Sequence, residues 1–260
     1  MAFTFEDMLI DRALEIVFLQ NGKVVGGLNQ IASFSINQTS ETKDKTDAQG
    51  VLIKRFFTSK SVEVSGENAT ISLGLMALQN GTEKQVASGE NKMILPRIIK
   101  VKASNSPITL ADAPVGQIYV SGLTATGVPD PALSYTLDTQ AGAGKYAISG
   151  NEVSLPTDAT DFVQITYFYE AESAVAVTDA SDKFPQNCEM LVKVLACDPC
   201  DKETMRLVYI DFPSFQLSPD FDWTVDTESN QAFSGVATVD YCGTEKTLFV
   251  VSASEDDIEE

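Results

Sequence analysis

Apolar and polar residues alternate in a segment near the start of the chain, residues 27–37, and a second strand-like segment follows at residues 51–64. In the first segment Leu28 and Phe34 lie on one side of an extended chain, and mostly polar residues lie on the other. A two-residue period predicts a half-buried strand. The second segment is rich in β-branched and aromatic residues, which strands favour. The two runs predict a pair of strands.

A polar stretch of mixed charge, residues 38–51, separates the two predicted strands. It is longer than the roughly 2–5 residues that a hairpin loop takes. Gly50 near its end indicates a backbone position with unusual φ and ψ. Two interpretations follow: a mobile loop, or an arm that becomes ordered against a neighbouring molecule.

The remaining N-terminal pattern predicts further short elements. Residues 12–19 read as a strand that ends at Asn21-Gly22, a pair typical of a tight hairpin turn. Residues 68–79 read as a helix, with Asn80-Gly81 as its stop signal. Residues 92–102 predict a strand, and Pro96 makes it an edge strand or a bent one.

Short alternating runs dominate the chain after residue 103, separated by Pro, Gly, Asp and Ser. They predict a small β-sandwich or an elaborated sheet. Residues 188–195 and 205–212 predict a hairpin. Residues 232–241 and 247–251 predict the last hairpin, after an irregular stretch. The closing SASEDDIEE has five acids in its last six residues and predicts a solvated, mobile end.

Charge is distributed unevenly over the 260 residues, which carry a net charge of −19. Residues 1–100 are neutral overall, residues 101–187 sum to −7 and residues 188–260 to −12. This balance argues against tight nucleic-acid binding, which depends on Lys and Arg. It fits either solubility alone or a surface that stays near nucleic acid without binding it.

Several functional classes lose support from the sequence. The chain has no histidine, so Ser-His-Asp and Cys-His catalysis are excluded. Glu6 and Asp7 stand where a secretory signal carries positive charge, so we expect no signal peptide. No apolar stretch approaches the ~18 residues of a membrane span.

Candidate metal ligands are few. Cys197 and Cys200 have the spacing of a zinc knuckle or redox pair, and Cys242, on another predicted turn, could reach them. Free reduced cysteines are the favoured interpretation. Asp220 and Asp222 could place two carboxylates on one strand face, although acid pairs are common by chance at this composition. We expect no metal, no cofactor and no catalytic residue.

Two groups of short phrases resemble the major tail proteins, or tail tube proteins, of tailed bacteriophages. They cover roughly the first 100 and the last 75 residues. The phrases are LNQI at 28–31, TSET at 39–42, TDAQG at 46–50, residues 56–61 and LMALQNG at 75–81, then residues 207–214, 233–243 and 248–251.

The resemblance implies a mainly β fold: a tail-tube-type β-sandwich or barrel with one flanking helix and a long β-hairpin arm, plus a small inserted β lobe. It implies six-membered rings that stack into a tube through which double-stranded DNA passes without specific binding. The implied partners are further copies of the chain, tape-measure protein, and tail-terminator or connector protein, with no membrane. The implied location is the virion tail, assembled in the host cytoplasm.

The arm would join stacked rings, and the residues that we expect to do so are Ser40, Glu41, Lys43, Asp44, Lys45, Asp47 and Gln49. The expected organisation is a first core part at 1–103 (arm 38–51, helix 68–79), a β-rich insertion or second lobe at 104–184, a second core part at 185–254 and an acidic tail at 255–260. The alternative function is a virion decoration or surface-adhesion module with an immunoglobulin-like domain. An enzyme ranks third.

Overall fold

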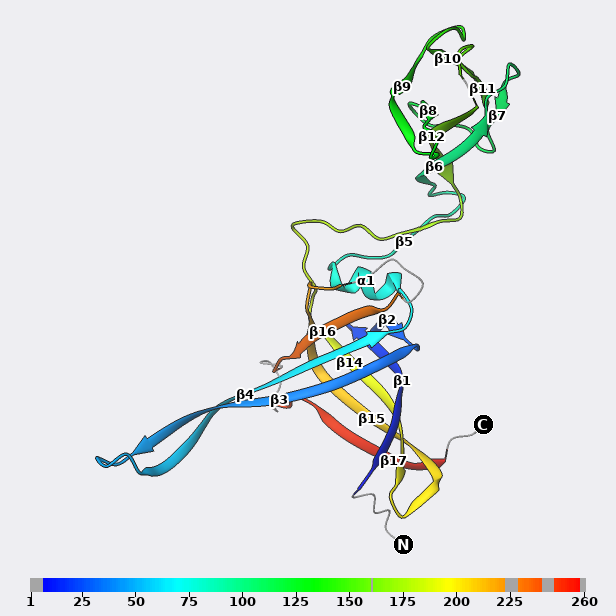
Figure 1. The fold of residues 1–260 in the computed structure, drawn as a ribbon. Coiled ribbons are helices and arrows are strands. Elements are labelled where there is room, and N and C mark those ends of the chain that lie inside the picture. Colours follow the sequence, from blue (N-terminus) through cyan, green and yellow to red (C-terminus); the bar gives the residue numbers. More distant parts are fainter. Residues whose placement is uncertain (1–6, 160, 223–228, 240–245, 258–260) are drawn as a thin grey trace. The chain divides into compact units, whose positions relative to one another are not determined.

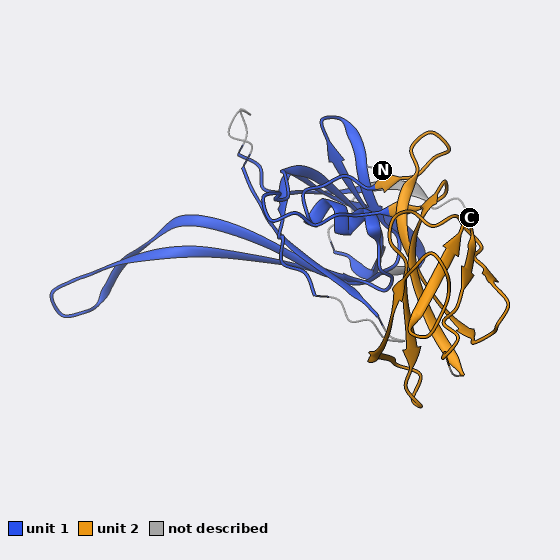
Figure 2. Cartoon of the chain, turned by 90° about the horizontal axis from the view of Figure 1, so that it is seen from above, with its two compact units in different colours: residues 1–84, 176–260 blue, residues 85–175 orange. Residues whose placement is uncertain are grey.

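The computed structural model describes residues 7–159, 161–222, 229–239 and 246–257 (Figure 1). The chain divides into two compact units, Met1–Lys84 with Ala176–Glu260, and Gln85–Val175 (Figure 2). The second unit starts and ends earlier than the insertion expected at 104–184. The reason is that β6 (Met93–Lys102), expected in the core part, pairs along its whole length with β12 (Phe162–Ala171).

One antiparallel, eight-stranded sheet forms the first unit, in the order β2-β1-β14-β15-β16-β4-β3, with β17 also paired to β15. The long strand β15 pairs with β14 over most of its length, with β17 along its middle and with β16 near its end. The strands are β1 Leu9–Gln20, β2 Lys23–Leu28, β3 Ile31–Thr46, β4 Leu52–Asn68, β14 Cys188–Asp198, β15 Asp201–Leu217, β16 Gln231–Ala237 and β17 Val250–Asp257.

Alternate residues of these strands point into one hydrophobic core, as the two-residue period requires. Ile16, Phe18 and Phe212 are fully buried there. Phe34 and Ile36 of β3, at one end of the strand order, pack against the same cluster. The sheet therefore curls over a shared core. The other buried members include Val62, Val64, Met190, Val192, Val194, Val208, Phe215, Leu217 and Phe233.

The helix α1 (Leu73–Gln79) is shorter than the predicted helix at residues 68–79. Its first expected residue, Asn68, instead closes the ladder of β4, paired with both Ile31 and Gln231. Ser72 caps the helix by accepting a hydrogen bond from the Leu75 backbone N–H. The β-ladder thus continues where the apolar spacing alone resembled a helix.

Seven strands form the sheet of the second unit, in the order β6-β12-β8-β9-β10-β11-β7. Its separate core is built around Tyr146, Val163 and Tyr167. As Pro96 predicted, β6 is an edge strand. The remaining strands are β5 Gln85–Val86, β7 Ile108–Thr109, β8 Tyr119–Leu123, β9 Pro129–Leu137, β10 Lys145–Ser149, β11 Glu152–Ser154 and β13 Val175–Ala176, the last paired with β5.

Some predictions for the C-terminal part were wrong. The stretch after residue 212 is not irregular from its start, because β15 continues to Leu217 by pairing with β16. The expected hairpin at 232–241 and 247–251 does not form between described residues, since β16 and β17 each pair with β15. The acidic tail is not a mobile end from residue 252, because β17 runs to Asp257.

Other predictions were confirmed. Asn21 and Gly22 have φ of 52° and 72° at the β1–β2 turn, and Gly50 has φ of 83°. The β14–β15 hairpin forms as expected. The fold is mainly β with one helix and a long β-hairpin arm among the described residues. No described helix is long and apolar enough to cross a membrane.

Candidate functional site: the arm and the polar face of its sheet

Strands β3 and β4 continue well beyond the core as a two-stranded ribbon, Ser40–Lys60, which we call the arm (Figure 1). The last buried residue on β4 is Val62, paired with Gln38. Nine further residues along β3 lead to Asp47, which corresponds to about 30 Å at ~3.3 Å per residue. The polar stretch that left two interpretations open is therefore a strand and a tight turn.

The turn at the end of the arm is built by Asp47. Its carboxylate accepts hydrogen bonds from the backbone N–H groups of Gln49 (2.9 Å) and Val51 (2.8 Å). Gly50, with φ of 83°, donates its N–H to the Asp47 carbonyl at 3.1 Å. This short-range bonding is typical of Asp in turns. It explains how a charged segment folds without a core.

The two sides of the arm differ in chemistry because of a bulge. The register shifts between Glu41↔Ser59 and Thr42↔Phe57, which leaves Thr58 unpaired in the ladder. Past this point Asp44, Arg55 and Phe57 share one side. The other side, here called the basic face, carries Lys43, Lys45, Lys54 and Phe56. The Lys54 ammonium lies 4.9 Å from the Phe56 ring centroid.

An ion pair joins the two strands of the arm. Arg55 donates from Nε and from a terminal nitrogen to the two carboxylate oxygens of Asp44, each at 2.8 Å. This bidentate contact lowers the pKa of Asp44 and raises that of Arg55, mainly through the side-chain hydrogen bonds. The contact fixes the register of an otherwise solvent-exposed ladder.

Large apolar side chains are exposed along the returning strand. Phe57 is 73% exposed and Ile53 62%. Val51, Leu52 and Phe56 are exposed as well. The residues that the sequence predicted to join stacked rings are all polar and lie at 40–49. These five apolar residues were missed. The available signal was a strand with five large apolar residues paired with a strand that has none to cover them. Such an exposed patch indicates an interaction site.

The structure places all seven predicted arm residues on this ribbon. Ser40 pairs with Lys60, and Glu41 pairs with Ser59. From Ser40 through Lys60 the sequence has five basic and three acidic residues, a net charge of +2 in a chain of −19. The arm is therefore a locally basic segment of an acidic protein.

A second surface is the side of β3, β4 and β16 that points away from the core. We call it the polar face. Cross-strand rows join Ser33 to Glu67 and Ala232, Ser35 to Ser65 and Ser234, and Asn37 to Glu63, Val236 and Gln216. The set holds four serines and two glutamates and no Lys or Arg. It is polar and negatively charged.

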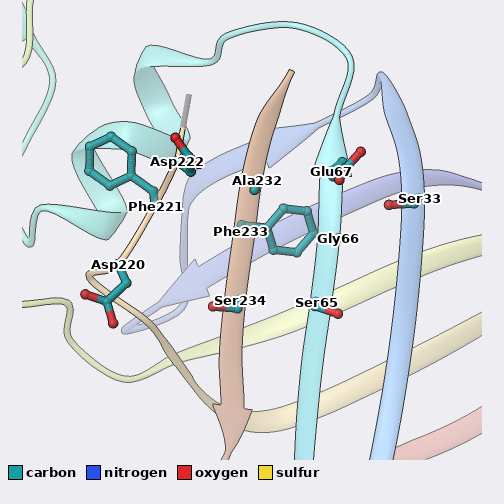
Figure 3. Close-up of a pocket in the computed structure, with 10 residues that line it drawn as sticks. All are labelled: Ser33, Ser65, Gly66, Glu67, Asp220, Phe221, Asp222, Ala232, Phe233 and Ser234. Carbon is teal, nitrogen blue, oxygen red and sulfur yellow. The ribbon is translucent and has the colours of Figure 1, made fainter. Parts of the chain in front are cut away.

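Part of the polar face is hollowed (Figure 3). Ser33, Ser65 and Ser234 line a hollow of about 450 Å³ together with Asp220 and Asp222. The two aspartates lie in a loop after β15, not on a strand as the sequence suggested. Within the described ranges no three His, Cys, Asp or Glu side chains are grouped as a metal site. The hollow offers carboxylates and hydroxyls but no assembled catalytic group.

The cysteines do not form a described metal site either. Cys197 is on β14 and half-buried, and Cys200 is exposed at the following turn. Cys242 lies outside the described residues. Cys188 is buried at the other end of β14, and burial raises its pKa to about 11. Each described cysteine is a free thiol.

The model of the YomU/Tube protein family matches residues 10–250, which include the arm, the polar face and the whole second unit. A search of curated proteins found no match.

Proposed function

We propose, because the chain belongs to the YomU/Tube protein family, that it is a structural subunit of a bacteriophage tail tube. Copies assemble into rings, with six subunits in each ring according to the resemblance. The rings stack into a conduit for DNA. The observation that carries the proposal is the arm, an ordered ribbon with exposed Phe56 and Phe57 and no core of its own. Such a surface needs a partner.

Ring closure is supported by the sheet edges. The described strand order ends at β2 and at β3, and each has only one paired neighbour in that order. Unpaired strand edges favour pairing with another chain, and a closed ring removes them. Pairing between the edge strands of adjacent copies would join their sheets around an axis.

The polar face is the surface that suits the inside of the tube. DNA binding depends on cationic side chains that neutralise phosphates. The cross-strand rows of this face present Glu63, Glu67 and serine hydroxyls, with no Lys or Arg. DNA would pass such a wall without adhering to it.

This role requires no catalysis, and we propose that the protein is not an enzyme. Its partners are further copies of itself, tape-measure protein and the terminator or connector protein at the tube ends. It acts in the virion tail after assembly in the host cytoplasm. The second unit, with a core of its own, would be an addition that is not needed for ring closure.

The experiment is negative-stain electron microscopy of the purified protein over a concentration series. The matched variant replaces residues 41–59 with Asn-Gly, a two-residue hairpin turn between the paired residues Ser40 and Lys60. We expect rings and tubes from the intact chain, and rings that do not lengthen from the variant.

A control variant, Ile98→Ser, changes an exposed apolar residue of the second unit (63% exposed) and should assemble normally. Monomers from the intact chain at every concentration would contradict the tail-tube proposal. They would favour the alternative of a decoration or adhesion module.

A further inference from the structure

A third surface lies on the outer side of β1, β14, β15 and β17, opposite the core; we call it the apolar face. One cross-strand row joins Val17, Leu191, Asp211 and Val250. The next row joins Glu15, Lys193, Tyr209 and Ser252, and a further row joins Arg12, Leu195 and Leu207. Tyr209 and Val250 are 39% and 46% exposed. This composition contrasts with the serines and glutamates of the polar face on the same sheet.

Asp211 is the unusual member of the apolar face. It lies between Leu191 and Val250 on the neighbouring strands. Its Oδ1 atom is buried and has no hydrogen-bond partner among the described residues, and burial raises its pKa. No described ion pair involves it. A shielded carboxylate among apolar side chains is costly unless a cation or donor reaches it.

We propose that the apolar face is the docking surface for the basic face of the arm of a second copy, with Asp211 receiving a lysine of that arm. The proposal rests on the tail-tube function and adds to it the partner surface of the arm. The arm presents Lys43, Lys45 and Lys54 around Phe56. The apolar face presents Asp211 as a shielded acid beside Leu191 and Val250.

Charge and shape both favour this pairing. The basic face has three lysines with no ion pair in the described chain, whereas Arg55 on the opposite side is already paired with Asp44. The rows of the apolar face also carry Glu15 and Glu189 and the cations Arg12 and Lys193, so that with Asp211 three acids stand against two bases. A ribbon of two strands can lie along the outer side of the sheet, where Phe56 would bury against Leu191 and Tyr209. Complementary charge then fixes the register.

The arm that docks belongs to another copy, not to the same chain. A paired ladder with two register shifts connects the core pair Gln38↔Val62 to the turn at Asp47, and it directs the arm away from its own sheet (Figure 1). Folding back would require the ladder to break.

Site-specific photo-crosslinking tests the proposal. A benzoyl-phenylalanine replaces Phe56 on the basic face, and the matched control replaces Phe57 on the other side of the same strand. Assemblies from mixed ¹⁵N-labelled and unlabelled protein identify links between copies by mass spectrometry. We expect position 56 to link to residues 189–195, 205–211 or 250–253 of another copy, at least about fivefold more often than position 57.

Charge exchange gives a second readout. We expect Asp211→Arg to raise the concentration needed for tube growth at least tenfold, and Lys54→Glu together with Lys45→Glu to restore part of it. Asp211→Asn, which removes a shielded charge, checks that the fold survives. Tubes that form with cross-links elsewhere and no rescue would overturn this docking surface alone. Failure of the unmodified chain to assemble would instead overturn the tail-tube function.

Discussion

Arg55 and Asp44 face each other across the two strands of the arm and share two hydrogen bonds of 2.8 Å. They are joined where no hydrophobic core holds the strands together. Double-donor contacts of this type combine charge with fixed geometry. The arm thus contains an ion pair that holds its two strands in register. A ribbon that is formed before it docks requires such a contact.

The Asp44–Arg55 ion pair predicts that the order of the arm depends on pH. The hydrogen bonds from Arg55 lower the pKa of Asp44 in the folded arm. The contribution is therefore complete above the unfolded pKa of about 3.9 and is lost as the pH falls through the lowered folded value. Carboxyl NMR of Asp44 should show a titration below that of a free aspartate, with a simultaneous change in the amide signals of Thr42 and Phe57.

Asp44→Asn is the control for this prediction. It should give weaker arm order at neutral pH, and the amide signals of Thr42 and Phe57 should respond less to acid between pH 5 and 2 than in the unmodified protein. Amide signals that respond to acid equally in both proteins would show that another group controls the arm.

Gln231 should be the main polar contributor to the attachment of α1. Its side chain accepts from the Ser72 N–H at 2.7 Å and donates to Gln79 at 3.3 Å, and it is fully buried. Gln231→Ala leaves both partners unsatisfied and should cost about 1–3 kcal/mol of unfolding free energy. Urea unfolding followed by circular dichroism measures it.

Ser234→Ala, on the same strand but on the polar face, is the comparison for Gln231. It should change the unfolding free energy by less than about 0.5 kcal/mol. A similar loss of unfolding free energy in both variants would show that the loss does not come from the Gln231 hydrogen bonds.

Thiol reactivity should separate Cys200 from Cys188. Cys200 is exposed, whereas Cys188 is 6% exposed and its pKa is raised to about 11. At pH 8 the Cys188 thiol is protonated and shielded, so iodoacetamide should modify Cys200 at least a hundredfold faster. Peptide mass spectrometry after timed quenching gives both rates, and urea should abolish the difference. Rapid labelling of Cys188 in the folded chain would contradict its described burial.

The polar face should repel DNA because of its glutamates. Assembled wild-type protein should not retain short double-stranded DNA at physiological salt. Glu63→Lys with Glu67→Lys places two cations in each subunit's wall, so retention should appear and weaken as salt rises. Fluorescence anisotropy of labelled DNA measures it. The control variant carries Glu152→Lys and Glu172→Lys in the second unit. If it retains DNA equally well, the polar face has no special role in excluding DNA.

Local patterns in the sequence were sufficient to predict turns, and strands whose pairing partner is the next strand along the chain. Asn21-Gly22 and Gly50 were correct because positive φ is a property of one or two residues. The hairpin of β14 and β15 was correct because two apolar runs flank a short turn. The helix start failed at Asn68, where pairing with Gln231, 163 positions away, continues a strand.

The candidate surfaces depend on distant pairings and were only partly predictable. Charge identified the outgoing strand of the arm, from Ser40 to Gln49. The exposed Phe56 and Phe57 were missed, because apolar residues in a strand are ordinarily buried and only the pairing with Lys43 and Thr42 leaves them open. Likewise Asp211 became notable only beside Leu191 and Val250.

The most direct test of the central claim is cryo-electron microscopy of the assembled protein, with a reconstruction that resolves strand direction. The account predicts closed rings in which Glu63 and Glu67 face a central channel and the arm of each subunit contacts the next ring. Closed rings with the polar face on the outside, or an arm that contacts nothing, would contradict it.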